Sequence, residues 1–246
     1  MRSVGGIAAA IALAAAMSIE ARQATAETAP DDRAQARLLF FAGTDVWRHG
    51  GFAHSGAQWS PNGLDRDGFA LKVMFNGGSY RYVSGALGNA EVRGRQFAGA
   101  ILPGWRIVSG SQVLTLFAGL DLQDHRLSPD DPAAGLRGRH VGARVALELW
   151  YAPTAATMLA ADASVSNLGP SYSARISAGL RLFDRCYVGP EVQGFAADDN
   201  YRQLRAGLHV SALRIHAVEW AAGLGWATDS DHRANLYARL GMNLRR

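Results

Sequence analysis

Apolar and polar residues alternate along most of the chain from about residue 38 onward, as in β-strands whose two faces meet different surroundings. The stretch 140–151 shows this alternation most clearly. One of its faces carries mainly aliphatic side chains, namely Val141, Ala143, Val145, Leu147, Leu149 and Tyr151. The other face carries His140, Gly142, Arg144, Ala146, Glu148 and Trp150. An amphipathic helix would instead repeat its apolar residues every three or four positions, so the pattern favours an all-β chain.

The alternation predicts twelve strands, separated by segments rich in glycine, proline, asparagine and aspartate. The predicted strands cover residues 38–48, 51–60, 68–81, 94–108, 112–123, 140–151, 155–167, 172–183, 186–197, 201–212, 215–228 and 234–246. Each has at least ten residues, whereas strands of soluble proteins average about five or six. A strand that crosses an outer membrane needs about 9–11 residues. Strand length and the even strand count therefore favour a membrane barrel over a soluble β-sandwich, although alternation is compatible with both.

The connections between the predicted strands support the same fold. Short turns at 109–111 and 152–154 alternate with longer connections at 85–94 and 124–138. Outer-membrane barrels have short periplasmic turns and longer outer loops, and both long connections lie on the outer side if the two termini are periplasmic. We therefore expect an antiparallel outer-membrane β-barrel of about twelve strands.

The N-terminus has the layout of a secretory signal peptide. Arg2 supplies a positive charge, residues 4–17 form an uncharged and mostly apolar run, and residues 24–26 read Ala-Thr-Ala, an A-x-A cleavage site. A short alanine-rich helix or a membrane anchor is the alternative, but an anchor needs about 20 strongly apolar residues. We expect a signal peptide over residues 1–26, a polar arm over 27–37 and the barrel domain over 38–246.

Composition excludes several classes of function. The chain contains a single cysteine, Cys186, so neither a disulfide framework nor a thiolate metal cluster can form. The net charge is +4 and no run of five like charges occurs, which argues against a nucleic-acid-binding tail. The acidic and histidine residues around 121–125 and 229–232 match no zinc or calcium spacing. We predict no cofactor, no metal and no nucleic-acid partner.

The polar faces of the predicted strands indicate what fills the barrel. An arginine that faces lipid at the bilayer midplane costs about 2–4 kcal/mol, so charged residues must point inward. The candidate lumen-lining residues are Arg144, Glu148, Trp150, Arg175, Arg181, Gln193, Gln203, Arg205, His209, Glu219 and Arg239. Two interpretations remain open: a lattice of ion pairs that fills the lumen, or a narrow polar conduit.

Two further sets of residues allow alternative interpretations. His209 and Ser211 form a His-x-Ser pair like that of some lipid deacylases, but both fall on the polar face, and no G-x-S-x-G motif occurs. We therefore expect no enzymatic activity. Aromatic residues near strand ends could form interfacial girdles or pack inside; they are Trp47, Trp59, Trp105, Trp150, Tyr151, Trp220 and Trp226.

The chain also resembles a known family through many short segments after residue 43. They include GTDVWR (43–48), GFAH (51–54), WSPNGLDRDGF (59–69), LPGWR (102–106), DHRLSPDDP (124–132), LWYAPT (149–154), DASVS (162–166), SYSAR (171–175), LFDR (182–185), GPEVQ (189–193) and YRQLRAG (201–207). On these segments the chain resembles the bacterial cellulose biosynthesis protein BcsS family.

The resemblance implies an accessory role in cellulose production in a Gram-negative bacterium, and it supplies no catalytic residues. The expected partners are outer-membrane lipid, a cellulose or glucan chain and other components of cellulose synthesis. Glucan is neutral and rich in hydroxyl groups, so it would suit a lumen that combines charged hydrogen-bonding groups with the rings of Phe117, Trp150 and Tyr237. A conduit or docking site for glucan is one expected role, and a structural barrel with a closed, salt-bridged lumen is the other. An outer-membrane lipid hydrolase is the third alternative.

Overall fold

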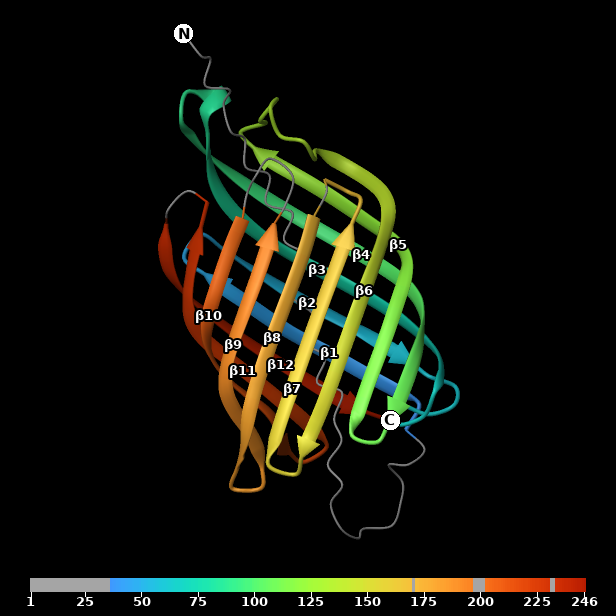
Figure 1. The fold of residues 1–246 in the computed structure, drawn as a ribbon. Helices are drawn as coiled ribbons and strands as arrows, with labels where there is room; N and C mark the ends of the chain where they lie inside the picture. The colour runs from blue at the N-terminus through green and yellow to red at the C-terminus, as the bar shows by residue number, and fades with distance from the viewer. Residues whose placement is uncertain (1–35, 170, 197–201, 231–232) are drawn as a thin grey trace.

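The computed structural model describes residues 36–169, 171–196, 202–230 and 233–246. They form a closed antiparallel barrel in which every strand pairs with the next along the chain and β1 pairs with β12 (Figure 1). The strands are β1 (Leu38–Trp47), β2 (Gly50–Trp59), β3 (Gly68–Ser84), β4 (Ala90–Ser109), β5 (Gln112–Ser128), β6 (Gly138–Thr154), β7 (Thr157–Ser166), β8 (Ser171–Leu182), β9 (Cys186–Ala196), β10 (Arg202–Ile215), β11 (Val218–Asp229) and β12 (Ala234–Arg245). The predicted fold is confirmed. The predicted signal peptide and most of the predicted arm lie outside the described residues.

The strands from β3 to β6 are longer than alternation predicted. β4 has 20 residues and begins at Ala90, and β5 continues to Ser128. The connection expected at 85–94 is therefore only a tight turn around a short 3-10 helix, Gly85–Leu87. The predicted bounds of these strands were wrong because arginines occupy the outward positions at the strand ends. The prediction had relied on aliphatic residues at outward positions to recognise a strand. Figure 1 shows the β3–β4 hairpin extending beyond its neighbours, at the end of the barrel away from the C-terminus.

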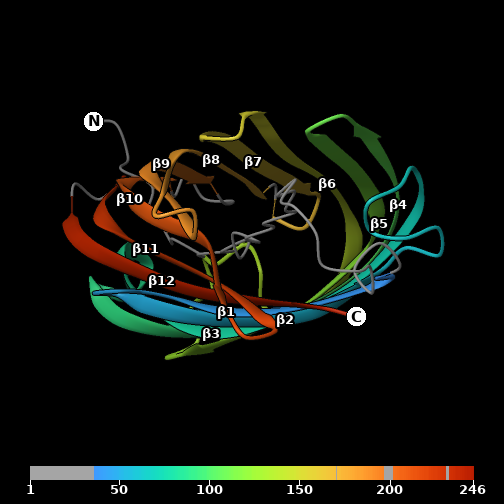
Figure 2. The same cartoon turned by 90° about the horizontal axis from the view of Figure 1, so that it is seen from below.

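The two faces of the barrel wall differ as the alternation requires. The outer face exposes aliphatic and aromatic side chains; on β5 these are Leu116, Leu120 and Leu122. The inner face carries nearly all the buried charged residues, such as Lys72, Arg205 and Glu191. Figure 2 looks along the barrel and shows β1–β3 lying across the interior from β6–β8. Apolar surface on the outside and ionised groups within fit a barrel surrounded by lipid.

Bulky aromatic side chains inside the barrel lie against glycines of the neighbouring strand. A Cβ atom at Gly94 would lie 2.2 Å from Cζ of Tyr80, its cross-strand partner. A Cβ atom at Gly56 would lie 2.4 Å from Cζ of Phe41, again directly opposite in register. Glycine at these positions lets a ring lie flat on the adjacent backbone, which places large side chains in the interior without widening the wall.

Helical structure is minor. Among the described residues no helix is long and apolar enough to cross a membrane.

Candidate functional site

The candidate site is the interior of the barrel. The structure buries ten of the eleven candidate side chains; they are Arg144, Glu148, Trp150, Arg175, Gln193, Gln203, Arg205, His209, Glu219 and Arg239. Arg181 is different: it lies near the β8–β9 turn with 22% of its side chain exposed, and its Nε is 3.6 Å from Oδ1 of Asp184.

An ion pair between Lys72 and Glu148 joins β3 to β6, two strands that are not neighbours in the sheet. Lys72 is the chain's only lysine and is fully buried. Its ammonium nitrogen also lies 4.9 Å from the centre of the Phe41 ring and 5.3 Å from that of Phe117. A buried ammonium needs a carboxylate and benefits from ring faces, so this group joins opposite parts of the wall.

A second ion pair joins β10 to β1. Nη1 of Arg205 donates to both carboxylate oxygens of Asp45, at 2.6 and 2.7 Å. The guanidinium carbon lies 5.0 Å from the ring centre of Trp47, 4.7 Å from that of Phe195 and 5.2 Å from that of Tyr237. Arg205 is thus enclosed by three aromatic rings and one carboxylate, which holds a charge that water does not reach.

A third ion pair joins β12 to β9 beside the second. Nε of Arg239 lies 3.0 Å from Oε2 of Glu191. The Tyr237 hydroxyl donates to Oε1 of the same carboxylate at 2.8 Å. Tyr237 therefore contacts both groups, because its ring faces Arg205 while its hydroxyl binds Glu191.

Two further ion pairs lie between adjacent strands. Asp121 on β5 accepts from Nη2 of Arg144 at 2.9 Å and from the hydroxyl of Ser166 at 2.5 Å. Arg175 on β8 donates to Asp162 on β7 at 2.8 Å. These contacts fasten the wall locally, whereas the three pairs described before them extend across the interior.

The end of the barrel near the C-terminus is filled by the β2–β3 connection. Leu64 in this connection is 1% exposed, and its backbone carbonyl accepts a hydrogen bond from the buried Arg106. Arg245, next to the C-terminus, lies 3.1 Å from Asp65. The connection is therefore held against the inside of the wall.

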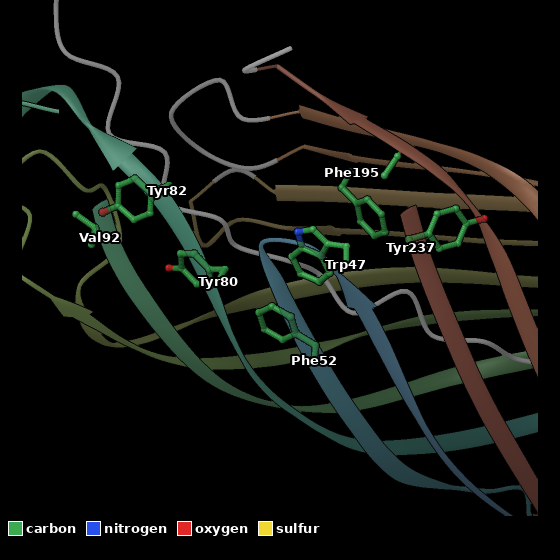
Figure 3. Packing of buried hydrophobic residues seen from close by; sticks show 8 residues of the cluster. Trp47, Phe52, Tyr80, Tyr82, Val92, Phe195 and Tyr237 are labelled. Carbon is green, nitrogen blue, oxygen red and sulfur yellow. The ribbon is translucent and has the colours of Figure 1, made fainter. Parts of the chain in front are cut away.

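The other end contains a row of aromatic rings on the inner face of β1, β2 and β3 (Figure 3). Trp47 lies parallel to Phe52 with their ring centres 6.0 Å apart, and Phe52 lies 6.5 Å from Tyr80. Tyr82 continues the row at 6.2 Å from Tyr80. All four side chains are buried, with Phe195 and Tyr237 facing them from β9 and β12.

The aromatic residues expected either in interfacial girdles or in the interior divide between the two faces of the wall. Trp59, Trp105, Tyr151 and Trp226 are exposed on the outer face. Trp47 and Trp150 are buried inside and belong to the lumen clusters. Both tryptophans lie on the same face of their strand as inward-pointing charged residues. Their position in the alternation therefore turns their side chains into the barrel.

Where the structure describes them, the groups that suggested catalysis or metal binding are not brought together into a site. His209 and Ser211 are buried, and no hydrogen bond joins them in the described part of the chain. No group of three metal-ligating side chains was found among the described residues. Asp121 is instead bound to Arg144 and Ser166, and His232 lies outside the described residues.

The ion-pair partners Lys72, Asp45, Asp121, Asp162 and Glu191 were not among the candidate site residues. The alternating pattern does predict that these five side chains face inward, because each lies an even number of positions from a buried residue of the same strand. Which oppositely charged residue each one meets depends on strand register and on the curvature of the whole barrel, and a sequence pattern contains neither.

Two solved outer-membrane channels of very different sequence have a similar barrel fold. A deltaS2S3 mutant of the TodX monoaromatic hydrocarbon channel aligns with a TM-score of 0.53 and 10% identity over 88% of this chain and 90% of that chain. The COG4313 outer membrane channel from Pseudomonas putida F1 aligns with a TM-score of 0.51 and 10% identity over 89% of this chain and 100% of that chain. These likenesses support the barrel fold. The apolar outer surface of that barrel is typical of an outer-membrane protein.

Sequence comparison identifies the family. No curated protein matches the sequence. The family model described as cellulose biosynthesis protein BcsS matches residues 39–246, which is the whole barrel apart from its first residue. The chain therefore belongs to the BcsS family of cellulose biosynthesis proteins.

Proposed function

We propose that this protein is an anchoring barrel of the cellulose-producing machinery and that its lumen is closed. The observation that carries the proposal is the burial of the charged side chains inside. Arg205 and Lys72 both lie on the inner face of the barrel, and both are 0% exposed. In an open conduit these side chains would contact solvent.

Opening such a lumen would separate paired charges. A glucan chain passing through the interior would have to displace the pairs Lys72–Glu148, Arg205–Asp45 and Arg239–Glu191, each of which joins strands that are not neighbours. Breaking a buried ion pair is strongly unfavourable, because it leaves charges without partners in a region of low dielectric constant. The geometry therefore favours attachment over transport.

A second candidate, a lumen that binds or conducts glucan, is favoured by a different observation. Both side-chain amide atoms of Gln58 and of Gln193 are buried and have no hydrogen-bond partner among the described residues. Sugar hydroxyls are suitable partners for amides, and the aromatic row from Trp47 to Tyr82 offers apolar ring surfaces to a sugar chain. This candidate requires the interior to widen first.

Conductance separates the two candidates. The full chain inserted into planar bilayers should show no steady ion conductance if the lumen is closed. A Lys72→Ala/Glu148→Ala variant, which removes two large side chains, serves as a positive control and should conduct more than the wild type. A wild-type channel that is open and is blocked by cello-oligosaccharides would overturn the anchoring proposal.

A cellular measurement addresses the same question. Lys72→Met/Glu148→Leu replaces the ion pair with apolar side chains of similar size. These side chains gain nothing from contact with water, so they keep the lumen closed at this point. Cells carrying this variant should secrete as much cellulose as the wild type if the barrel anchors other components. Loss of secretion, at an unchanged amount of folded barrel in the outer membrane, would instead support passage of glucan through the lumen.

A further inference from the structure

A cluster of arginines lies on the outer face of the barrel at the end away from the C-terminus. Arg48 follows β1, Arg81 lies on β3, and Arg93 and Arg95 lie on β4; all four are exposed. They line a basin of about 390 Å³ with His49 and Ser79. Burial, and then the charges of Arg233 and Arg48, lower the pKa of His49, in keeping with a positive potential at this edge.

The arginines are placed unfavourably for the stability of the sheet. Arg81 lies directly opposite Arg93 in the β3–β4 pairing, and Arg95 lies directly opposite Arg126 in the β4–β5 pairing. Like charges at directly opposed positions destabilise a sheet. An anion bound between them would remove this repulsion.

Few carboxylates neutralise the cluster. Glu91 lies 3.9 Å from Arg81, and Asp124 lies 3.2 Å from Arg126. No carboxylate in the described part of the chain lies within ion-pair distance of Arg48, Arg93 or Arg95. The basin therefore keeps an excess of positive charge.

An apolar groove of about 470 Å³ lies next to the basin on the same outer face. Its outward-facing floor consists of small residues on β1, β2 and β3, including Ala53 and Gly77. The rings of Phe75 and Phe97 border it, with centres 6.4 Å apart and each about half exposed. Because the neighbouring outward side chains face lipid, this groove is open to hydrocarbon rather than to water.

The basin and the groove follow each other along the same strands. On β4, Phe97 lines the groove and Arg95, two residues earlier and on the same face, lines the basin. On β3, Gly77 lines the groove and Ser79 lines the basin. The outer surface thus changes from apolar to cationic over two residues along each strand. A lipid leaflet changes in the same order, from acyl chains to charged headgroups.

We propose that this surface binds a phosphorylated glycolipid of the outer leaflet, with phosphate groups between the arginines and an acyl chain in the groove. Guanidinium groups bind phosphate through paired hydrogen bonds, and four of them surround the basin. A soluble anion would occupy the basin but would have no use for the adjoining groove. The proposal places this end of the barrel at the cell surface.

Binding to purified lipid A tests the proposal on the full chain in detergent micelles, by native mass spectrometry. Lipid A with two phosphates should bind the wild type, and the same lipid without phosphates should bind much more weakly. Arg93→Gln/Arg95→Gln should weaken binding roughly thirtyfold, since each surface arginine contributes about 1 kcal/mol toward an anionic lipid. The matched control Arg66→Gln/Arg185→Gln changes two exposed arginines outside the basin and should bind as the wild type does.

A second variant tests the groove separately. Ala53→Phe fills the groove from an exposed position on β2 and should weaken binding of lipid A but not of inorganic phosphate. Heat-modifiable migration on gels verifies that each variant is folded. Equal binding of phosphorylated and dephosphorylated lipid would overturn the proposal. So would an Ala53→Phe variant that binds lipid A as tightly as the wild type does.

Discussion

At the scale of single residues, the interior is organised around charges that water does not reach. Lys72 has one carboxylate partner, Glu148, and two ring faces, whereas Arg205 has one carboxylate and three rings. Each cation therefore depends strongly on one acidic residue. The pairs hold particular strands together, although an apolar pair of similar volume can be equally stable.

Removing Glu148 tests this dependence. Glu148→Ala leaves the Lys72 ammonium buried without its carboxylate, and we expect the free energy of unfolding to fall by about 3–5 kcal/mol. Urea unfolding of the protein folded into lipid vesicles, followed by tryptophan fluorescence, measures the change. Lys72→Met/Glu148→Leu should recover most of the loss.

The exposed pair Arg81–Glu91 provides the control, because surface ion pairs contribute little to stability. Glu91→Ala should unfold almost as the wild type does. If Glu148→Ala were equally harmless, Lys72 would not depend on Glu148, and the proposal of a closed lumen that buries its charge would lose its support.

At the scale of strands, glycines decide where large rings can lie. Tyr80 lies over Gly94 of the neighbouring strand, and Tyr80 in turn contacts Phe52 and Tyr82 in the aromatic row. A side chain at position 94 would move Tyr80 and disturb the row at its middle. The positions of the glycines are thus part of the packing of the interior.

Gly94→Ala should therefore destabilise the barrel by about 1–3 kcal/mol, the usual cost of overpacking. The same vesicle-based unfolding measurement applies. Gly194→Ala is a matched control, because a Cβ atom at Gly194 on β9 would meet nothing within 4 Å. Equal effects of the two substitutions would show that Tyr80 does not depend on Gly94.

At the scale of the whole molecule, the tryptophans differ in exposure, and Trp220 on β11 is half-buried. Trp59, Trp105 and Trp226 are exposed on the outer face, whereas Trp47 and Trp150 are buried inside. Only the outer tryptophans can contact lipid if the barrel is inserted as its surface indicates. This difference tests the membrane placement without any assumption about function.

Fluorescence quenching by brominated lipid chains measures that contact. We expect strong quenching of the wild type and a large loss of quenching in the Trp59→Phe/Trp105→Phe/Trp226→Phe variant. Trp47→Phe/Trp150→Phe should leave the fractional quenching equal or higher, because it removes signal that lipid does not reach. Stronger quenching of the inner pair would mean that the wall is inverted.

Much of the fold could be predicted from local pattern. A period of two depends only on which side chains prefer hydrocarbon, and it located every strand of the barrel as well as the inward direction of Arg144, Arg205 and Arg239. The pattern misplaced the ends of β3 to β6 that lie away from the C-terminus, because Arg81, Arg93 and Arg126 interrupt the aliphatic face while the backbone pairing continues. It also left the directions of Trp47 and Trp150 open as girdle or interior.

The sequence by itself determined an all-β chain with one apolar and one charged face, because each position carries its preference for lipid or water regardless of its neighbours in space. Only the tertiary structure decided how the charged face is used. The pairing of Lys72 with Glu148, and of Arg205 with Asp45, requires strands distant in sequence to curve toward each other. Closure of the sheet sets that curvature, and with it the partner that each inward charge meets.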